Sequence, residues 1–346
     1  DDELEEAERQ ARELIAAGVD ALIVQDMALR RMDLPVELHA STQVSNRTPE
    51  GARFLGEAGF ARVILERNLS LDEIRAICRA TRAEVECFVH GAICVGYSGR
   101  CFLSRSMSAR SGNRGACSQP CRLTYDLTDG RGHTYIAGKH LLSVRDMNLS
   151  AHLGELLDAG VTSFKIEGRM KSPEYVFAVT SVYRKALDAA LAKENAAITD
   201  ADRDRLTDAF SRGFTTAYLD GKRGNDIMSY QRPNNRGLFL GRVDEVRDGA
   251  AYLKSAHALT EGDVLEFWTR KGNGTLTLGP VRTDKKGRYI RQERYAGALS
   301  RSFYVGEGVK KEDIHAKFED GILRISLPAP QQTKALPENP NLIAIE

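Results

Sequence analysis

The 346 residues include 49 Lys and Arg against 48 Asp and Glu, which gives a formal net charge of +1. A chain with this balance has no bulk affinity for polyanions, so any contact with a nucleic acid must come from local patches. No apolar run of about 18 residues and no signal-peptide pattern occurs, which predicts a cytoplasmic protein without membrane contact. The six cysteines then favour metal or redox chemistry over a disulfide framework.

Residues 1–190 alternate amphipathic helices with short apolar strands. Helices are predicted at 4–17, at 49–58, from Leu71, and after Ser172, which serves as N-cap with Pro173 at the first helical position. Strands are predicted at 19–24, 35–42, 62–66, 84–89 and 162–167. Successive strand–helix units predict an α/β fold, a parallel (β/α) barrel over residues 1–200. About five strands are visible where a barrel has about eight, and the first residue is Asp1, so we expect an N-terminally truncated barrel.

The pattern changes after residue 200. A helical connector is predicted over 201–235, with its helix at 203–214. Residues 236–283 predict a small β-barrel domain, because short β segments alternate there with turn residues, at 238–243, 250–253, 264–268 and 275–278. The last segment, 285–346, follows a charged linker and has predicted strands at 300–305, 315–318 and 323–327.

Four cysteines lie in one stretch rich in glycine, serine and arginine, namely Cys94, Cys101, Cys117 and Cys121. This composition is typical of a functional loop, and four thiolates are what a cubane iron–sulfur cluster requires. Zinc is the main alternative, but structural zinc sites favour ligand pairs two to four residues apart, and only Cys117 and Cys121 have that spacing. Unliganded thiols are the third hypothesis. Cys78 and Cys87 lie in a predicted helix and strand and are interpreted as core residues.

The same stretch is strongly basic, with no Asp or Glu from Cys87 to Tyr125. Guanidinium groups suit phosphate or carboxylate recognition. We therefore expect substrate contacts from Arg100, Arg105, Arg110, Arg114, Arg122, Asn113 and Gln43. An RNA backbone or a dicarboxylate would suit such a patch. The alternative is that individual arginines cap loops or pair with carboxylates elsewhere.

Polar residues also follow predicted strand ends, where barrel enzymes place their chemistry. Lys165, Glu167 and Arg169 lie at one such end and are catalytic candidates. Strand alternation puts Lys165 and Glu167 on one face, which allows an ion pair between them, either functional or purely structural. His39, at another strand end, is the fourth catalytic candidate. His90, beside the cysteine loop, is interpreted as a satisfied polar residue.

A hydrolytic mechanism has less support in the sequence. No serine elbow, no His-Glu-x-x-His motif and no protease-type pair of carboxylates occurs. A cysteine protease would use a lone reactive thiol, whereas the thiols here are clustered. Peptidase activity is therefore the weaker of the two enzymatic hypotheses.

Longer motifs around the cysteines permit a family assignment. The segments at 86–104, 110–115, 117–122, 164–169 and 232–237 resemble the signature of the collagenase-like peptidases, peptidase family U32, over about residues 1–283. The sequences of segments 105–110 and 139–143 are most similar to the branch that hydroxylates a cytidine of ribosomal RNA. Sister branches hydroxylate a tRNA uridine or the ubiquinone ring. The resemblance thus implies an RNA hydroxylase, and the family name keeps a peptidase as the alternative.

The resemblance also implies a cofactor and a co-substrate. Family hydroxylases carry a four-iron four-sulfur cluster on cysteines that align with Cys94, Cys101 and Cys117. The fourth ligand varies between branches, and Cys121 is the nearest candidate here. The RNA hydroxylases are thought to depend on prephenate, a dicarboxylate, so the arginine patch could serve either RNA or prephenate. A non-catalytic RNA-binding protein with a structural cluster is a further alternative.

The tail has a second resemblance. Residues 294–309 and 314–328 resemble the second half of the α-crystallin domain of small heat-shock proteins (Hsp20), and Ile343-Ala-Ile345 matches that family's C-terminal anchor. Half a β-sandwich leaves open edges, so we expect a partial α-crystallin sandwich that associates with another chain by strand addition. Self-association through Ile343 and Ile345, with a chaperone or oligomerisation role, is the second alternative function. A reading frame joined from two genes would explain both the missing start and this tail.

Overall fold

The computed structural model describes residues 3–194, 198–221, 224–247, 250–255, 257–269, 272–279, 282–283, 289–290, 315–319 and 322–326. The chain divides into two compact units, Asp1–Gly241 and Arg242–Glu346. The cysteine loop and every candidate catalytic residue belong to the first unit.

A seven-stranded mixed sheet forms the centre of the first unit. Its strands are β1 (Ala21–Val24), β2 (Glu37–Ala40), β3 (Arg62–Ile64), β4 (Glu84–Gly91), β7 (Asp146–Asn148), β8 (Ser163–Ile166) and β9 (Phe214–Thr215). The order is β1-β2-β3-β4-β7-β9, and β8 also pairs with β4. Strands β1 to β4 and β8 run parallel, whereas β7 is antiparallel to β4.

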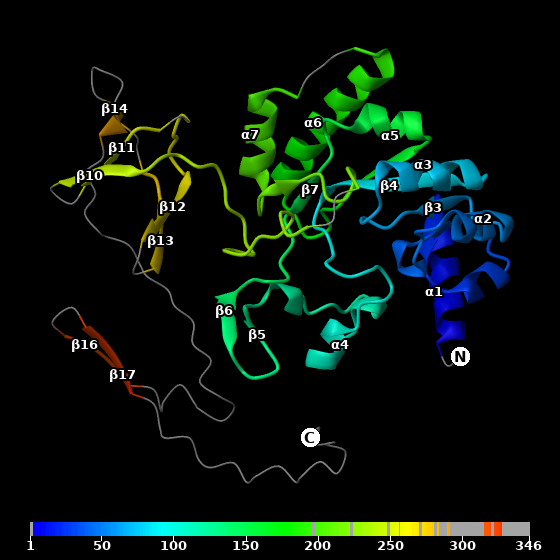
Figure 1. Ribbon diagram of the computed structural model, residues 1–346, viewed down its shortest axis with the longest axis horizontal. Helices are drawn as coiled ribbons and strands as arrows, with labels where there is room; N and C mark the ends of the chain where they lie inside the picture. Colours follow the sequence, from blue (N-terminus) through cyan, green and yellow to red (C-terminus); the bar gives the residue numbers. More distant parts are fainter. Residues whose placement is uncertain are drawn as a thin grey trace, which may run out of the picture. The chain divides into compact units, whose positions relative to one another are not determined.

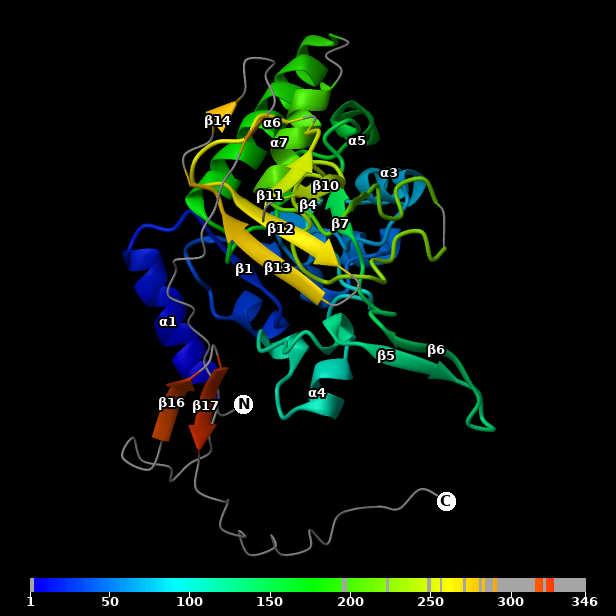
Figure 2. The same cartoon turned by 90° about the vertical axis from the view of Figure 1, so that its left-hand side faces the viewer.

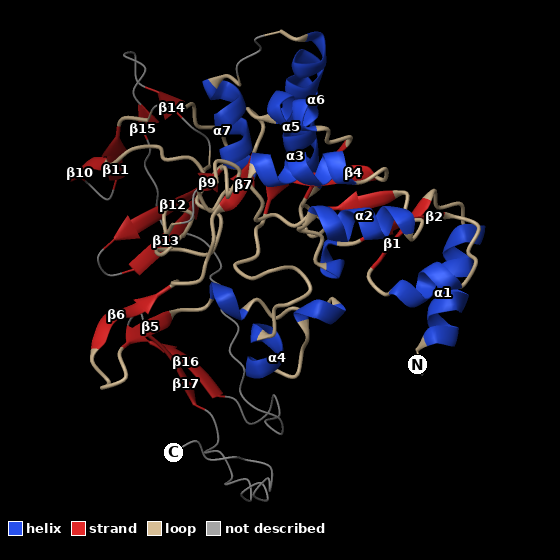
Figure 3. Cartoon of the chain, turned by 45° about the vertical axis from the view of Figure 1, so that its right-hand side comes forward, coloured by secondary structure: helices blue, strands red, loops and turns tan. Residues whose placement is uncertain are grey.

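Five α-helices of the first unit lie side by side in one layer along the sheet (Figure 1). They are α2 (Pro49–Glu57), α3 (Leu71–Ala80), α5 (Leu153–Ala159), α6 (Pro173–Ala192) and α7 (Asp200–Ala209), while α1 (Leu4–Ala16) lies near β1 and β2 (Figure 3). Local chemistry fixes where these helices begin. Ser70 and Glu73 form a capping box at α3, and Ser172 caps α6 with Pro173 at its first position.

The core lies between this helix layer and the sheet. Val63 and Val89 of the strands and Ile77, Leu156 and Val179 of the helices are fully buried. Because side chains alternate along a strand, one face of β4 carries apolar residues and the other carries Glu84 and Glu86. The sheet therefore has an apolar face that packs on the helices and an opposite face rich in charge. Cys78 and Cys87 belong to the packed side, as predicted.

The segment between β4 and β7 projects from the sheet, away from the helix layer (Figures 1 and 2). It contains α4 (Leu103–Met107), the short 3₁₀ helices η3 (Gly112–Arg114) and η4 (Pro120–Arg122), and the hairpin of β5 (Tyr125–Thr128) and β6 (Thr134–Lys139). Two more 3₁₀ helices, η1 (Met27–Arg31) and η2 (Thr42–Val44), follow β1 and β2. The cysteine loop is thus part of the longest excursion from the sheet in the described part of the unit.

The predicted α/β fold is confirmed, and each predicted strand of residues 1–190 has a counterpart in the sheet. Three predictions need correction. The predicted helix at 203–214 ends at Ala209, because the backbone of Phe210 is already extended and β9 begins at Phe214. The sheet is mixed rather than parallel, because β7, which was not predicted, runs antiparallel to β4. Among the described strands no pairing joins β1 to β9, so closure into a barrel stays a prediction.

Antiparallel hairpins make up the described part of the second unit. Their strands are β10 (Val243–Arg247), β11 (Ala250–Leu253), β12 (Val264–Thr269), β13 (Gly272–Thr277), β14 (Arg282–Thr283), β15 (Tyr289–Ile290), β16 (His315–Glu319) and β17 (Ile322–Ser326). The predicted strand at 238–243 is wrong, because the strand begins at Val243. The predicted strand at 300–305, and Ile343 and Ile345, lie outside the described residues. The predicted boundaries at 201–235, 236–283 and 285–346 stay predictions.

Candidate functional site

The four clustered cysteines lie in the loop that follows β4. Cys94 comes three residues after the strand, Cys101 precedes α4, Cys117 lies between η3 and η4, and Cys121 lies within η4. Cys94 and Cys117 are exposed, and Cys101 and Cys121 are half-buried. The loop therefore presents its thiols at the carboxyl end of a central strand, partly open to a substrate.

Serine side chains hold the cysteine loop in shape. The buried Ser104 of α4 accepts a hydrogen bond from the Ser118 N–H at 2.9 Å, and the two hydroxyl oxygens lie 2.8 Å apart. The Arg110 guanidinium donates to the Ala116 carbonyl at 3.0 Å and to the Cys117 carbonyl at 3.4 Å. These bonds close the chain between Cys101 and Cys117 into a compact fold.

The four thiols are close enough to influence one another electrically. Burial raises the pKa of the Cys121 thiol, Arg122 lowers it, and the neighbouring Cys94, Cys117 and Cys101 raise it. The Gln119 N–H donates to the Cys117 sulfur at 3.3 Å, the kind of bond that stabilises cluster thiolates. Within the described residues, no group of three or more His, Cys, Asp or Glu is arranged around a single ion position. Each thiolate of a cubane ligates a different iron, so this donor set fits a cluster in its chemistry.

Arg122, a predicted substrate contact, makes several hydrogen bonds within the chain. Its guanidinium donates to the Ser143 hydroxyl at 2.8 Å, to the Val144 carbonyl, and to the Ile93 carbonyl at 3.3 Å. Burial lowers the pKa of Arg122, as does Arg212, whereas Cys121 and Cys94 raise it. Arg122 thus fastens η4 to the end of β4 and places a cation beside two of the thiols.

Most of the other predicted substrate arginines also have partners within the chain. Arg105 donates to the Ala109 carbonyl at 2.9 Å, and Arg114 pairs with Glu3 at 2.6 Å. With Arg110 and Arg122, they match the alternative of loop caps and ion pairs. Arg100 is exposed, and Asn113 is half-exposed in η3.

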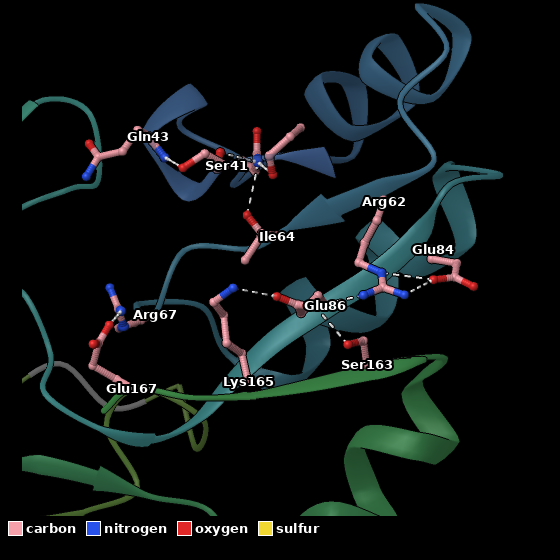
Figure 4. Close-up of polar contacts among 12 residues, drawn as sticks. Ser41, Gln43, Arg62, Ile64, Arg67, Glu84, Glu86, Ser163, Lys165 and Glu167 are labelled. Carbon is pink, nitrogen blue, oxygen red and sulfur yellow. Dashed lines mark hydrogen bonds and ion pairs between the residues drawn. The ribbon is translucent and has the colours of Figure 1, made fainter. Parts of the chain in front are cut away.

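The charged face of the sheet carries a network centred on Glu86 of β4 (Figure 4). Its carboxylate lies 3.2 Å from the Lys165 ammonium and 3.1 Å from the Arg62 guanidinium, and it accepts from the Ser163 hydroxyl at 2.8 Å. Burial raises the pKa of Glu86, but Ser163, Lys165 and Arg62 outweigh that effect and hold it below its usual value. Glu86 is therefore a buried anion matched on three sides.

Lys165 and Glu167 do not pair with each other, which corrects the ion pair allowed by their shared face. Lys165 pairs with Glu86, and Glu167 pairs with Arg67 at 3.1 Å (Figure 4). The register decides this, because Glu86 of β4 lies opposite Ser163 of β8 and so within reach of Lys165. Arg169 follows β8 and is exposed.

Arg67 connects the charged face with the cysteine loop. Its guanidinium lies 3.5 Å from the centre of the Phe88 ring, and its side chain is 12% exposed. Burial lowers the pKa of Arg67, whereas Cys94 and Glu167 raise it. A desolvated cation thus lies between a cluster thiol and a candidate catalytic carboxylate.

His39 and Gln43 lie at the end of β2. His39 is 8% exposed, and its Nε2 atom is 3.5 Å from the Glu37 carboxylate. The Gln43 N–H donates to the Ser41 hydroxyl at 3.2 Å (Figure 4). Asn46 donates to the carbonyls of Ala40, Ser41 and Ile64, which ties this loop to β3. These residues shape the rim beside the cysteine loop.

Sequence reasoning missed Glu66 and Arg67, which lie two and three residues after the end of β3. Glu66 is 5% exposed, accepts from the Ser45 hydroxyl at 2.9 Å and accepts from the Ser98 N–H at 3.3 Å. The available signal was a charged pair at the end of the predicted strand 62–66. Its partners, Ser98 and Glu167, lie 32 and 100 residues away in the chain, so no local pattern could find them.

Comparison with known proteins gives two family matches. The profile described as "Peptidase family U32" matches residues 1–229, and the profile described as "Hsp20/alpha crystallin family" matches residues 270–346. Both agree with the predicted resemblances, although the second begins earlier than the predicted 285–346.

Three relatives carry names that bear on function. The chain is 45% identical over 280 residues to the 23S rRNA 5-hydroxycytidine C2501 synthase of Escherichia coli K12, which covers 78% of this chain and 43% of that protein. It is 36% identical to tRNA hydroxylation protein P1 of Bacillus subtilis 168, covering 73% of this chain and 63% of that protein. It is 35% identical to a collagenase of Porphyromonas gingivalis W83, covering 60% and 54%. The chain thus spans less than two thirds of each of these relatives. Among the described helices, none is both long and apolar enough to cross a membrane.

Proposed function

Because the chain belongs to peptidase family U32, we propose that it is an iron–sulfur-dependent RNA hydroxylase that acts on a ribosomal RNA cytidine. The observation that carries this proposal is the 45% identity to the E. coli 5-hydroxycytidine synthase over 280 residues. The relative from B. subtilis makes a tRNA uridine the alternative target. An RNA substrate also implies a cytoplasmic location.

A [4Fe–4S] cluster on Cys94, Cys101, Cys117 and Cys121 is the proposed cofactor. The mutual influence of these thiols and the N–H bond to Cys117 support it. When bound, the cluster would supply one-electron redox chemistry at the end of β4. Arg122 and Arg67 place positive charge beside Cys121 and Cys94, which would offset the negative charge of metal-bound thiolates.

The residues around the cluster are assigned roles by exposure and contacts. Arg100 and the exposed Tyr97 are suited to RNA, since the Tyr97 ring, 49% exposed, already stacks under the Arg47 guanidinium at 3.8 Å. Lys165, paired with Glu86, and Glu167, paired with Arg67, are suited to orient the reacting base or its co-substrate. Arg169, His39, Gln43 and Asn113 complete the proposed rim. Prephenate, a dicarboxylate, is the proposed co-substrate.

Two structural proposals accompany this function. The mixed sheet and its helix layer would form part of a (β/α) barrel, with its charged face turned inward. The Hsp20 profile match supports a partial α-crystallin sandwich in the tail, which would self-associate through Ile343 and Ile345.

Peptidase activity is the second candidate, because one relative is named a collagenase. Nucleophilic hydrolysis needs a Ser or Cys in hydrogen-bonding contact with a base. In the described first unit, His39 and His152 contact carboxylates, His90 a phenol and His140 a backbone carbonyl, while His133 lies against the Tyr135 ring. That arrangement favours the hydroxylase.

The deciding experiment joins metal analysis to RNA chemistry. We expect the chain purified without oxygen to contain about four irons and four sulfides, and to add one oxygen atom to a cytidine of ribosomal RNA, detected by mass spectrometry. Cys94→Ala is expected to lose iron and activity, whereas Cys78→Ala, outside the cluster, keeps both. One zinc per chain, or cleavage of collagen without RNA modification, would overturn the proposal.

A further inference from the structure

A second group of cations lies near Arg122, whose pKa Arg212 lowers. It comprises Arg145, Lys171, Arg212 and Arg236, which come from separate segments of the chain. A Cβ atom placed on Gly213 would lie 3.5 Å from Arg145 Cδ and 3.6 Å from Arg236 Nη1, so these two side chains flank the residue after Arg212. The tertiary fold thus gathers like charges that the sequence keeps apart.

Like charges in a partly buried group need an anion nearby. Asp146 is 1% exposed and pairs with Arg212 at 3.1 Å, and its carboxylate also accepts from the Arg212 N–H. Burial lowers the pKa of Lys171 to about 8, Arg212 lowers it as well, and Asp146 raises it. Burial also lowers the pKa of Arg236, as does Arg145. Asp146 is therefore already engaged, and the group keeps an excess of positive charge.

The Lys171 ammonium is held between aromatic rings. It lies 2.7 Å from the centre of the Phe210 ring and 5.5 Å from that of Tyr175. Within the described residues no carboxylate pairs with it. The Phe210 ring centre also lies 5.3 Å from the Arg212 guanidinium, so both cations lie close to the same ring.

His90 adds an unused polar atom at the same place. The residue is 1% exposed, and its Nδ1 atom lies 3.2 Å from the Tyr183 hydroxyl. Its Nε2 atom is buried and has no hydrogen-bond partner in the described part of the chain. Lys171 lowers the pKa of His90, and both residues lie near Tyr175, whose ring centre is 6.1 Å from that of His90 and 5.5 Å from the Lys171 ammonium. A buried polar atom without a partner is costly, which points to a missing ligand.

We propose that Lys171, Arg212 and His90 form a binding site for a small oxyanion, a carboxylate or a phosphate, next to the cysteine cluster. The two cations would contact the oxygen atoms and the imidazole would donate from Nε2. Arg122 is close to both groups of residues, because Arg212 and Asp146 as well as Cys121 and Cys94 influence its pKa. The inference rests on the proposed function in one respect, since the anion would be the small reactant of hydroxylation.

The burial of the site favours a free small anion over an RNA backbone. The side chain of Arg212 is 10% exposed. Exposed arginines of the cysteine loop are accessible to RNA, whereas this buried group admits only a compact ligand. The predicted patch on the loop and the oxyanion site would then bind different partners.

Calorimetric titration of the iron-loaded chain with malonate, and separately with inorganic phosphate, tests the site. We expect saturable binding of at least one anion. Lys171→Met is expected to weaken it by roughly 10- to 100-fold, the usual effect of losing one charge-assisted bond. Lys139→Met, which removes an exposed lysine of the β5–β6 hairpin, should leave binding unchanged. Arg212→Lys, which keeps the positive charge, should weaken anion binding less than the double variant Lys171→Met/Arg212→Lys.

Absence of saturable binding in the wild type, or equal binding by wild type and Lys171→Met, would overturn the site. A ribosomal RNA fragment that displaces malonate would support the site and assign the oxyanion to RNA phosphate, and lack of displacement would support it with a free anion as the ligand. If the chain hydroxylates RNA but binds neither anion, the oxyanion site alone is contradicted. If the chain binds an anion but modifies no RNA, the proposed function is contradicted and the oxyanion site is supported.

Discussion

Glu66 is a single carboxylate that joins two loops of the candidate site. It accepts from Ser45 in the loop after β2 and from the backbone of Ser98, between Cys94 and Cys101. Because the group is buried, its two bonds are expected to be worth about 1–3 kcal/mol each. Glu66 thus acts as a positioning residue for the cysteine loop rather than as a ligand.

Glu66→Gln is expected to lower the iron content of the purified chain and to shift the cluster's visible absorption. The amide keeps one acceptor oxygen but turns an NH₂ group toward a donor, so one of the two bonds is lost. Glu84→Gln is a matched control, because the Glu84 side chain is 56% exposed and pairs with Arg62 of the neighbouring strand. Equal iron content in both variants would show that Glu66 does not position the loop.

His90 predicts a specific dependence of stability on pH. Burial, and then Lys171, lower the pKa of His90 from 6.5 to about 4. Between these values the unfolded chain binds the proton and the folded chain does not, so the free energy of unfolding falls as the pH drops from 6.5 to 4. At about 1.4 kcal/mol per pH unit, the loss is on the order of 3 kcal/mol.

Urea unfolding of wild type and His90→Asn across this range measures the effect. The variant has no imidazole to titrate, so its stability should fall less steeply with acid, and other groups titrate equally in both proteins. Parallel curves for the two proteins would contradict the buried, neutral histidine.

At the scale of elements, the path of the cysteine loop depends on Gly99. This residue has a φ of +73°, and a Cβ there would lie 2.1 Å from the Gln43 carbonyl oxygen. The loop after β4 therefore packs directly on η2, with no room for a side chain. Glycine is required here by contact as well as by conformation.

Gly99→Ala is expected to displace the loop and to reduce iron content several-fold in a chain that still folds. Gly115→Ala is the matched control, since Gly115 has a φ of +77° in the same loop but no atom within 4 Å of its Cβ position. Both variants pay about 1–2 kcal/mol of backbone strain, so any difference between them reports the contact with Gln43. Loss of iron in both would attribute the effect to strain alone.

Helix α5 completes the layer that covers the sheet between α3 and α6. Its Leu156 is 0% exposed. Leu156→Ala is expected to lower the free energy of unfolding by about 2–5 kcal/mol, as buried leucines do. Leu191→Ala, at a site 61% exposed, should change it by less than about 0.5 kcal/mol. Denaturant unfolding gives both values, and similar losses would mean that α5 is not part of the core.

At the scale of the whole molecule, the two units have separable roles. The candidate site draws its residues from Asp1–Gly241, whereas the Hsp20 profile matches 270–346 in the second unit. A chain ending at Gly241 is expected to keep its iron while losing self-association, which light scattering of both chains measures. Loss of iron on truncation, or an unchanged particle size, would contradict this division.

The sequence predicted features that depend on neighbours in the chain. Short apolar segments indicated the strands at 62–66 and 84–89, and Ser172 with Pro173 indicated the start of α6. The hairpin β5–β6 and the short β7 escaped prediction. The six residues of β6 are all exposed, and the three of β7 are too short to show a period.

For the site, the sequence by itself determined which chemistry is present: four thiols, many guanidiniums, and charged side chains at strand ends. Tertiary structure decided which groups meet. Strand alternation placed Lys165 and Glu167 on one face. Only the pairing of β4 with β8 brought Lys165 within ion-pair distance of Glu86. Asp146 and Arg212, 66 residues apart, pair because β7 lies beside β9. Periodicity follows from backbone geometry and is local, whereas partner choice follows from packing and register, which no stretch of sequence contains.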